Sequence, residues 1–277
     1  MAGMRFTILG CGSSPGVPRI GNDWGACDPN NPLNRRSRCS LLVEKLDAGN
    51  KTTVLVDTGP DFREQALEHN LSWADAVLYT HSHADHTHGI DDLRGFVISQ
   101  RKKVDVYYDE PTGKRLMDAF GYCFKTPEGS NYPPILNGHL ISPDQKLQIH
   151  GSAGSIKIQV YEQTHGDINS LGFRFGRFAY SSDISSLPEK SFCALQDLDV
   201  LVLDALRYIP HPSHFSVDEA IACSLRLKPR LTVLTHMHID LDYKKLSREL
   251  PANIIPAFDG MIFETENDLS ECKLIGL

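Results

Sequence analysis

Residues 73–88 read WADAVLYTHSHADHTH, an apolar run followed directly by four histidines and an aspartate. The run WADAVLYT is rich in β-favouring residues, which predicts a strand in the core. His81 and His83 are two positions apart, so both side chains share one side of an extended chain, whereas the spacing of Asp85 and His86 suits a turn. Imidazole and carboxylate together are the usual ligands of zinc, manganese and iron. The segment therefore predicts a metal site rather than a solvated polar loop.

Other apolar runs along the chain also end at residues that can bind a metal. The runs TTVLVD, FAYSSD, DVLVLD and LTVLTH end at Asp57, Asp183, Asp204 and His236. Each run has the length and composition of a buried strand. Polar residues at the ends of buried strands lie at the rim of a sheet, where functional sites gather.

Helical patterns alternate with these predicted strands. Asp61 with Glu64 and Ser216 with Glu219 have capping-box spacing at the starts of two helices. Residues 90–97, after the histidines, have an apolar stripe at helical spacing. This alternation predicts an α/β fold with helices on the outside.

The composition limits the class of protein. The chain has 277 residues, of which 41% are hydrophobic and 23% charged, and no linker divides it, so we expect one domain over residues 1–277. A net charge of −7 argues against binding a large nucleic acid. We expect no membrane span, because no apolar run approaches the ~20 residues that a span needs. We expect no signal peptide, because the start MAGMRFTILGCG lacks the layout of one. Seven cysteines without a C-x-x-C pair favour free thiols in the cytoplasm.

The H-x-H-x-D-H motif of residues 81–86 resembles the signature of the metallo-β-lactamase fold superfamily. Further motifs of that superfamily follow in order, in QTHGD, YSSDIS and VLTHMH, and the resemblance covers about residues 5–243. It implies a four-layer αββα sandwich that binds two divalent metal ions. By this resemblance, one ion is held by His81, His83 and His165, the other by Asp85, His86 and His236, with Asp183 bridging the two. Asp57 would orient these ligands from behind.

Several longer stretches resemble the phosphodiesterase branch that includes phosphoribosyl 1,2-cyclic phosphate phosphodiesterase and, more distantly, ribonuclease Z. These are FTILGCGSSPGVPRIG, LVDTGPDFREQAL, PHPSHFSVDEA and LTHMHIDLDY. The branch implies a histidine in front of a late helix that reaches the scissile phosphate. His214 matches that position and His211 is a weaker candidate. His88 and Asp204 match no ligand position and are left out of the predicted site.

The resemblance implies a dinuclear phosphodiesterase that hydrolyses a small cyclic phosphate or nucleotide-like phosphodiester by a metal-bridging hydroxide. Asp85 would take or orient the proton of the nucleophile, and His214 would protonate the leaving alkoxide. The ligands suit Mn²⁺ or Zn²⁺, and also Fe²⁺. The sequence leaves the oligomeric state open, a homodimer included.

The N-terminal loop departs from the pattern of this branch. Members often bind a structural zinc there through C-x-C-x-x-C and a later histidine. Here Asn22 and Trp24 stand where two cysteines would, only Cys27 remains, and Ile239 takes the place of the histidine. We expect that zinc to be absent and the loop to be held by packing through Trp24. The RRSR run of residues 35–38 is interpreted as a solvated segment before a strand.

Three alternatives to the phosphodiesterase remain open. One is a ribonuclease Z-like tRNA 3′-processing endonuclease, although no Lys-rich arm for gripping tRNA is evident in the sequence. Another is a hydrolase of the same superfamily that cleaves a lactone or thioester. The last is a non-catalytic protein similar to the member of this fold in pyrroloquinoline quinone biosynthesis, which lacks the full histidine motif.

Overall fold

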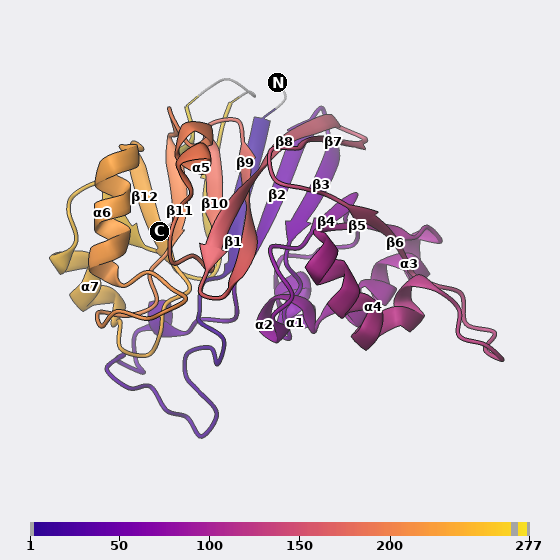
Figure 1. Ribbon diagram of the computed structural model, residues 1–277, viewed down its shortest axis with the longest axis horizontal. Helices are drawn as coiled ribbons and strands as arrows, with labels where there is room; N and C mark the ends of the chain where they lie inside the picture. Colours follow the sequence, from indigo (N-terminus) through magenta and orange to yellow (C-terminus); the bar gives the residue numbers. More distant parts are fainter. Residues whose placement is uncertain (1–2, 267–270, 276–277) are drawn as a thin grey trace.

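Two β-sheets pack face to face in this computed structural model, which describes residues 3–266 and 271–275 (Figure 1). Along the first sheet, the strands are β15 (Lys273–Leu274), β14 (Met261–Glu264), β1 (Gly3–Gly10), β2 (Ser40–Asp47), β3 (Asn50–Val56), β4 (Ala76–Leu78), β5 (Val104–Tyr108) and β6 (Leu136–Leu140). Along the second, they are β13 (Ile254–Pro256), β12 (Leu231–Thr235), β11 (Val200–Asp204), β10 (Phe178–Ser181), β9 (Ile168–Phe175), β8 (Gly154–His165) and β7 (Lys146–Gly151).

Helices form the two outer layers. Those on the side of the first sheet are α1 (Phe62–Glu68), α2 (Ala84–Thr87), α3 (Arg94–Gln100) and α4 (Glu110–Phe124), with the 3₁₀ helix η2 (Ile90–Leu93). The helices that connect strands of the second sheet are α5 (Glu189–Ala194), α6 (Val217–Leu227) and α7 (Tyr243–Glu249), and the 3₁₀ helix η1 (Pro32–Asn34) lies in the N-terminal loop. Figure 1 shows the layers in the order helix, sheet, sheet, helix. The predicted four-layer αββα sandwich is confirmed.

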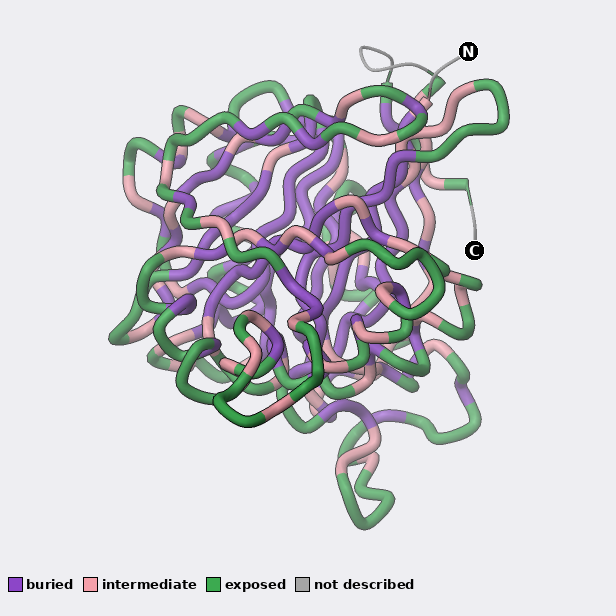
Figure 2. The backbone as a smooth tube through the Cα atoms, turned by 90° about the vertical axis from the view of Figure 1, so that its right-hand side faces the viewer, coloured by how far each residue is buried: buried purple, intermediate pink, exposed green. Residues whose placement is uncertain are grey.

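The main core lies between the two sheets. Phe6 of β1 stacks on Phe178 of β10, with ring centroids 4.0 Å apart, so the two inner faces are in direct contact. A second cluster lies under α1, α3 and α4, where Phe62 and Phe96 meet edge to face at 5.9 Å. Figure 2 shows the buried strands at the centre and exposed loops around them. Burial of this apolar surface is the main favourable contribution to folding.

The carboxyl ends of parallel strands bring the polar strand ends together. β3 pairs in parallel with β4, and β10, β11 and β12 are consecutive parallel neighbours. In parallel strands these ends lie along one edge of the sheet. Asp57 at this edge of the first sheet, and Asp183 and His236 at this edge of the second, adopt left-handed backbone conformations, with φ of 62°, 51° and 57°. Non-glycine residues adopt this conformation at a cost and mostly where the surroundings impose it, often in functional sites.

Two of the predicted helix starts have different outcomes. The capping box of Ser216 and Glu219 is present at the start of α6 and is confirmed. The capping box at Asp61 is wrong, because its side chain does not cap α1. Its Oδ2 instead accepts a hydrogen bond from the Arg38 backbone N at 2.8 Å. The predicted helix over residues 90–97 is split into η2 and α3.

The N-terminal loop packs as the sequence predicts. Val17, Cys27 and Ile239 form a small buried cluster, and Trp24 covers it. The interpretation of residues 35–38 as solvated is wrong for Arg36, which is only 2% exposed. Its guanidinium donates a hydrogen bond to the Leu241 carbonyl at 2.7 Å and so fixes the segment after His236.

Two further predictions concern the chain as a whole. No helix in the described residues is both long and apolar enough to cross a membrane. All seven cysteines, each in the described part of the chain, are free, and all except Cys193 are buried.

Candidate metal centre

Three histidines from two different sheets meet at one point. His81 and His83 follow β4, and His165 is the last residue of β8. One ring nitrogen from each of the three lies within 4.8 Å of the others. His165 Nδ1 contacts the Ser213 carbonyl at 2.6 Å, which directs its Nε2 towards His83 Nδ1, 3.2 Å away. This group corresponds to the first predicted set of ligands.

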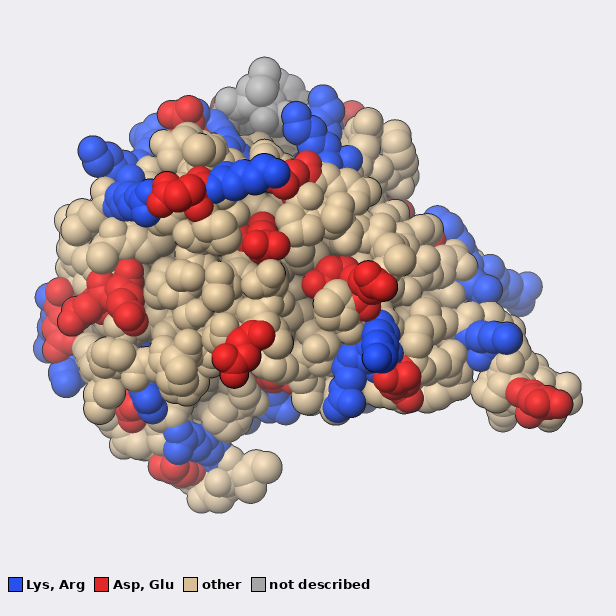
Figure 3. Space-filling view, in the orientation of Figure 1, with Lys and Arg blue, Asp and Glu red and all other residues tan. Residues whose placement is uncertain are grey.

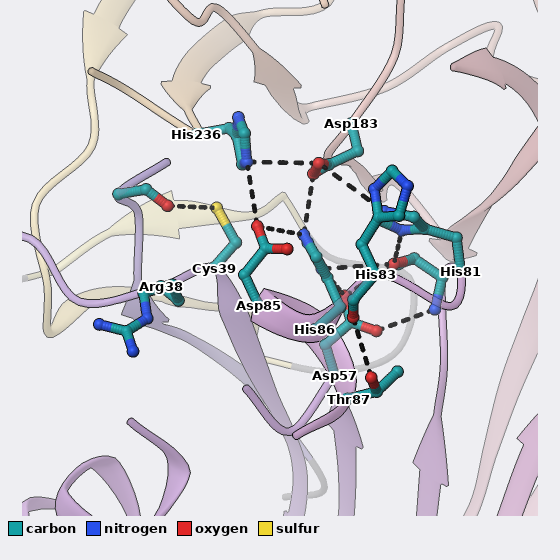
Figure 4. A network of polar contacts seen from close by, with 12 residues as sticks. Arg38, Cys39, Asp57, His81, His83, Asp85, His86, Thr87, Asp183 and His236 are labelled. Atoms are coloured by element: carbon teal, nitrogen blue, oxygen red, sulfur yellow. Dashed lines mark hydrogen bonds and ion pairs between the residues drawn. The ribbon is translucent and has the colours of Figure 1, made fainter. Parts of the chain in front are cut away.

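A second group lies beside the first and joins both sheets (Figure 4). It consists of Asp85, His86, Asp183 and His236, again with donor atoms within 4.8 Å of one another. His86 Nε2 lies 3.0 Å from Asp183 Oδ2 and 3.5 Å from Asp85 Oδ2. His236 Nε2 lies 3.3 Å from Asp183 Oδ1. Asp183 Oδ1 is also 4.0 Å from His81 Nε2, so this carboxylate lies between the two groups, where a bridging ligand would be.

The donor atoms of these groups fit a divalent cation. Apart from the ion-pair contacts between the histidines and carboxylates of the two groups, the buried Nε2 atoms of His81, His86 and His236 have no hydrogen-bond partner among the described residues. Leaving buried polar atoms without a partner costs about 1–3 kcal/mol each. Two ligands each about 2.1 Å from one ion lie roughly 3.0–3.5 Å apart. The separations of His86 and His236 from Asp183 match that spacing.

Asp57 lies behind the second group and contacts one of its histidines. Its carboxylate accepts hydrogen bonds from Thr80 N at 2.9 Å and Thr80 Oγ1 at 2.8 Å. It also lies 2.7 Å from His86 Nδ1. A proton held at Nδ1 by this carboxylate leaves the His86 Nε2 lone pair free for a metal. Such partners fix the tautomer and the ring orientation of a ligating histidine.

The electrostatic field of the second group favours positive charge, whereas burial lowers the pKa of the three histidines of the first group. Burial opposes ionisation of Asp183, but His236 and His86 hold its pKa well below the usual range. Burial likewise opposes protonation of His86, yet Asp183 and Asp57 raise its pKa well above the ordinary value. The pKa of His236 rises to about 9 against the effect of burial, mainly because of Asp183 and Asp85. Without cations, protons on the histidines balance the carboxylates, and divalent cations would take their place.

Asp204, which was left out of the predicted site, lies directly beside it. It ends β11, is fully buried, and its Oδ2 lies 2.7 Å from His214 Nδ1. The same oxygen accepts a hydrogen bond from Ile184 N, next to Asp183, at 2.9 Å. The signal in the sequence was its position at the end of a strand, which it shares with the predicted ligands.

His214 adjoins the metal ligands. Its ring stacks on that of His236 with centroids 4.5 Å apart and meets His165 edge to face at 4.7 Å. With Nδ1 against Asp204, Nε2 is the nitrogen free to meet a substrate. His211 lies 5.3 Å from the His214 ring but is less buried. His88 is exposed, packs on Phe120 and belongs to neither ligand group.

All the predicted site residues thus lie in one place, and their roles as ligands and catalysts stay predictions. A protein-family model described as the beta-lactamase superfamily domain matches residues 52–237, a segment that contains every predicted ligand. The chain belongs to this superfamily.

Two relatives cover nearly all of the chain. A solved diphosphatase of the PhnP family is 37% identical, covers 95% of this chain and 98% of its own, and superposes with a TM-score of 0.85. An octanoyltransferase of Porphyromonas gingivalis is 32% identical over 93% of this chain, which spans about half (51%) of that relative.

A more distant structure shares the fold alone. Zn²⁺-bound PqqB from Methylobacterium extorquens is 15% identical and covers 93% of this chain and 99% of its own, with a TM-score of 0.72. The family model and the diphosphatase place this chain among the metal-dependent hydrolases of the metallo-β-lactamase fold.

Proposed function

We propose that this chain is a dinuclear metal-dependent phosphodiesterase that hydrolyses a small cyclic phosphate or nucleotide-like phosphodiester. The observation that carries the proposal is the pair of adjoining ligand groups with the Asp204–His214 pair beside them. Mn²⁺ or Zn²⁺ suits this nitrogen and oxygen donor set, as does Fe²⁺. When bound, two such cations supply hydroxide at neutral pH and neutralise a non-bridging phosphate oxygen.

The residues of the chain supply the remaining chemistry. Asp85 Oδ2 lies 3.5 Å from His86 Nε2 and 3.7 Å from His236 Nε2, at the centre of the second group, where it can accept the proton of the nucleophile. His214 holds a proton at Nδ1 through Asp204, so in its charged form Nε2 carries a second proton for the leaving alkoxide. Because His214 contacts His236 and His165, this proton would lie close to a phosphate held by the two groups.

Hydrolysis of a diphosphate is a second candidate activity. It is favoured by the 37% identity to a protein described as a diphosphatase, which is matched over almost its entire length. The same centre suits both reactions, since each is an attack of water on phosphorus. They differ in the leaving group, because a phosphate leaves with less need of a proton than an alkoxide does.

The decisive experiment compares substrate classes on one metal-loaded preparation. Bis-p-nitrophenyl phosphate, a 2′,3′-cyclic nucleotide, a ribose cyclic phosphate and a dinucleoside diphosphate would be assayed with Mn²⁺ or Zn²⁺. We expect metal-dependent cleavage of the phosphodiesters that Asp85→Ala abolishes and His214→Ala slows, with His211→Ala as the matched control. An octanoyl thioester and a precursor tRNA serve as tests of the rival activities. Metal binding without cleavage of any phosphodiester would refute the proposal.

A further inference from the structure

A cavity of about 700 Å³ opens beside the first ligand group. Its wall is formed by the start of α4, the connection from β6 to β7, and the turn between β8 and β9. His81 and Ser82 lie at one side of it, so the cavity borders the metal centre at His81. His81 is 1% exposed and its Nε2 has no hydrogen-bond partner among the described residues. A phosphoester held at the metal centre therefore has this cavity next to it for one of its substituents.

Four carboxylates line the cavity, with no lysine or arginine among its lining residues: Asp109, Glu110, Glu162 and Asp167. Asp109 accepts a hydrogen bond from Thr112 N at 3.0 Å as the N-cap of α4. In the described part of the chain, Glu110, Glu162 and Asp167 form no ion pair. Three of the four charges are therefore not offset by any neighbouring cation.

Lys190 reaches the connection from β6 to β7 at the rim of the cavity, where it pairs with Asp144 at 2.5 Å. Figure 3 shows acidic and basic groups interspersed over one face of the molecule, with several acidic groups across its middle. The carboxylates of the cavity are also additional to Asp57, Asp85 and Asp183, which serve the metal centre.

We propose that this cavity receives the substituent of the phosphoester and selects one that is uncharged or cationic over one that carries a second anion. The inference rests on the proposed function and specifies its substrate class. The phosphate itself is attracted by the metal ions. Beyond them, a further phosphate or carboxylate would meet unpaired carboxylates, and like charges in a partly enclosed site repel. An ammonium group or a hydroxyl-bearing sugar meets no such repulsion.

Binding of three matched phosphate monoesters to the metal-loaded protein tests the cavity without turnover. The esters are phosphocholine, ethyl phosphate and 2-carboxyethyl phosphate, whose substituents are cationic, neutral and anionic. By calorimetry we expect phosphocholine to bind about tenfold more tightly than 2-carboxyethyl phosphate, with ethyl phosphate between them. Equal affinities, the reverse order, or no binding by any of the three would overturn the proposal.

Variants that remove carboxylates from the cavity test whether these residues cause the difference in affinity between the charged esters. Glu162→Gln combined with Asp167→Asn should reduce the difference between the charged esters to less than about threefold. Glu162→Gln alone should give an intermediate difference, and Glu68→Gln on the outside of α1 serves as the matched control. A preference that the double variant leaves unchanged would also overturn the proposal.

Turnover separates this inference from the proposed function. The corresponding p-nitrophenyl diesters would be assayed on the same protein. Cleavage with preference for the carboxyethyl diester would leave the phosphodiesterase standing and overturn the cavity inference. If the monoesters bind in the expected order but no diester is cleaved, the cavity inference stands and the phosphodiesterase proposal is refuted.

Discussion

Replacement of Asp204 by asparagine tests whether His214 acts as an acid. The Asp204 carboxylate lies 2.7 Å from His214 Nδ1 and is fully buried. A buried hydrogen bond to a charged group contributes about 1.5–3 kcal/mol. If that stabilisation is available to the imidazolium in the transition state, Asp204→Asn should lower kcat about 10- to 150-fold. Asparagine keeps an acceptor for Ile184 N, so the position of Asp183 next to it should change little.

The assay uses two esters with different leaving groups. A 2′,3′-cyclic nucleotide releases an alkoxide that needs a proton, whereas bis-p-nitrophenyl phosphate releases a phenolate that needs little help. We expect kcat for the cyclic nucleotide to fall by the whole factor of about 10 to 150, and kcat for the nitrophenyl ester to fall less than about threefold. The double variant with His214→Ala should be no slower than His214→Ala alone, because both changes remove one function.

The result that would refute this reasoning is an equal loss on both esters with the metal content intact. Additive losses in the double variant would refute it as well, since Asp204 would then act independently of His214. Metal content measured by mass spectrometry distinguishes both outcomes from a collapse of the ligand groups.

Three further predictions follow from the same structure. Asp57→Asn should weaken metal binding about 10- to 100-fold in a chelator competition, because Asp57 fixes the His86 ring, and unchanged affinity would contradict that role. Loading with Zn²⁺ or Mn²⁺ should raise the Tm of the wild-type protein, and the increase should be much smaller in Asp183→Asn. An equal increase in Tm in both proteins would exclude Asp183 as a shared ligand. Burial raises the pKa of Asp259 to about 6, even though Ser37 N and Cys11 N donate hydrogen bonds to it. Because this folded-state pKa lies above the ordinary 3.8, Asp259 stabilises the fold at acidic pH, and that contribution is lost as pH rises from about 4 to 6. The free energy of unfolding in urea of the wild type minus that of Asp259→Asn should therefore fall as pH rises across that range. A rise of this difference would refute the raised pKa of Asp259.

Residues near one another in the sequence were predicted well because local rules govern them. Strand composition and the polar residue that ends each strand are local properties, and they identified Asp57, His81, Asp183 and His236. The capping box of α6 involves only positions 216–219 and formed as predicted. The capping box at Asp61 failed because a competing partner, the backbone of Arg38, is 23 positions away.

The sequence by itself determined the class of fold, the strand ends that carry donors, and the nitrogen and oxygen ligands that suit a divalent metal. Only the tertiary structure decided that Asp204 serves His214, that Arg36 is buried against the Leu241 carbonyl, and that four carboxylates from separate segments share one cavity. The physical reason is that periodicity and chain-end chemistry are encoded within a few residues. Partners and cavities instead depend on which distant loops the packing of two sheets brings to the same edge.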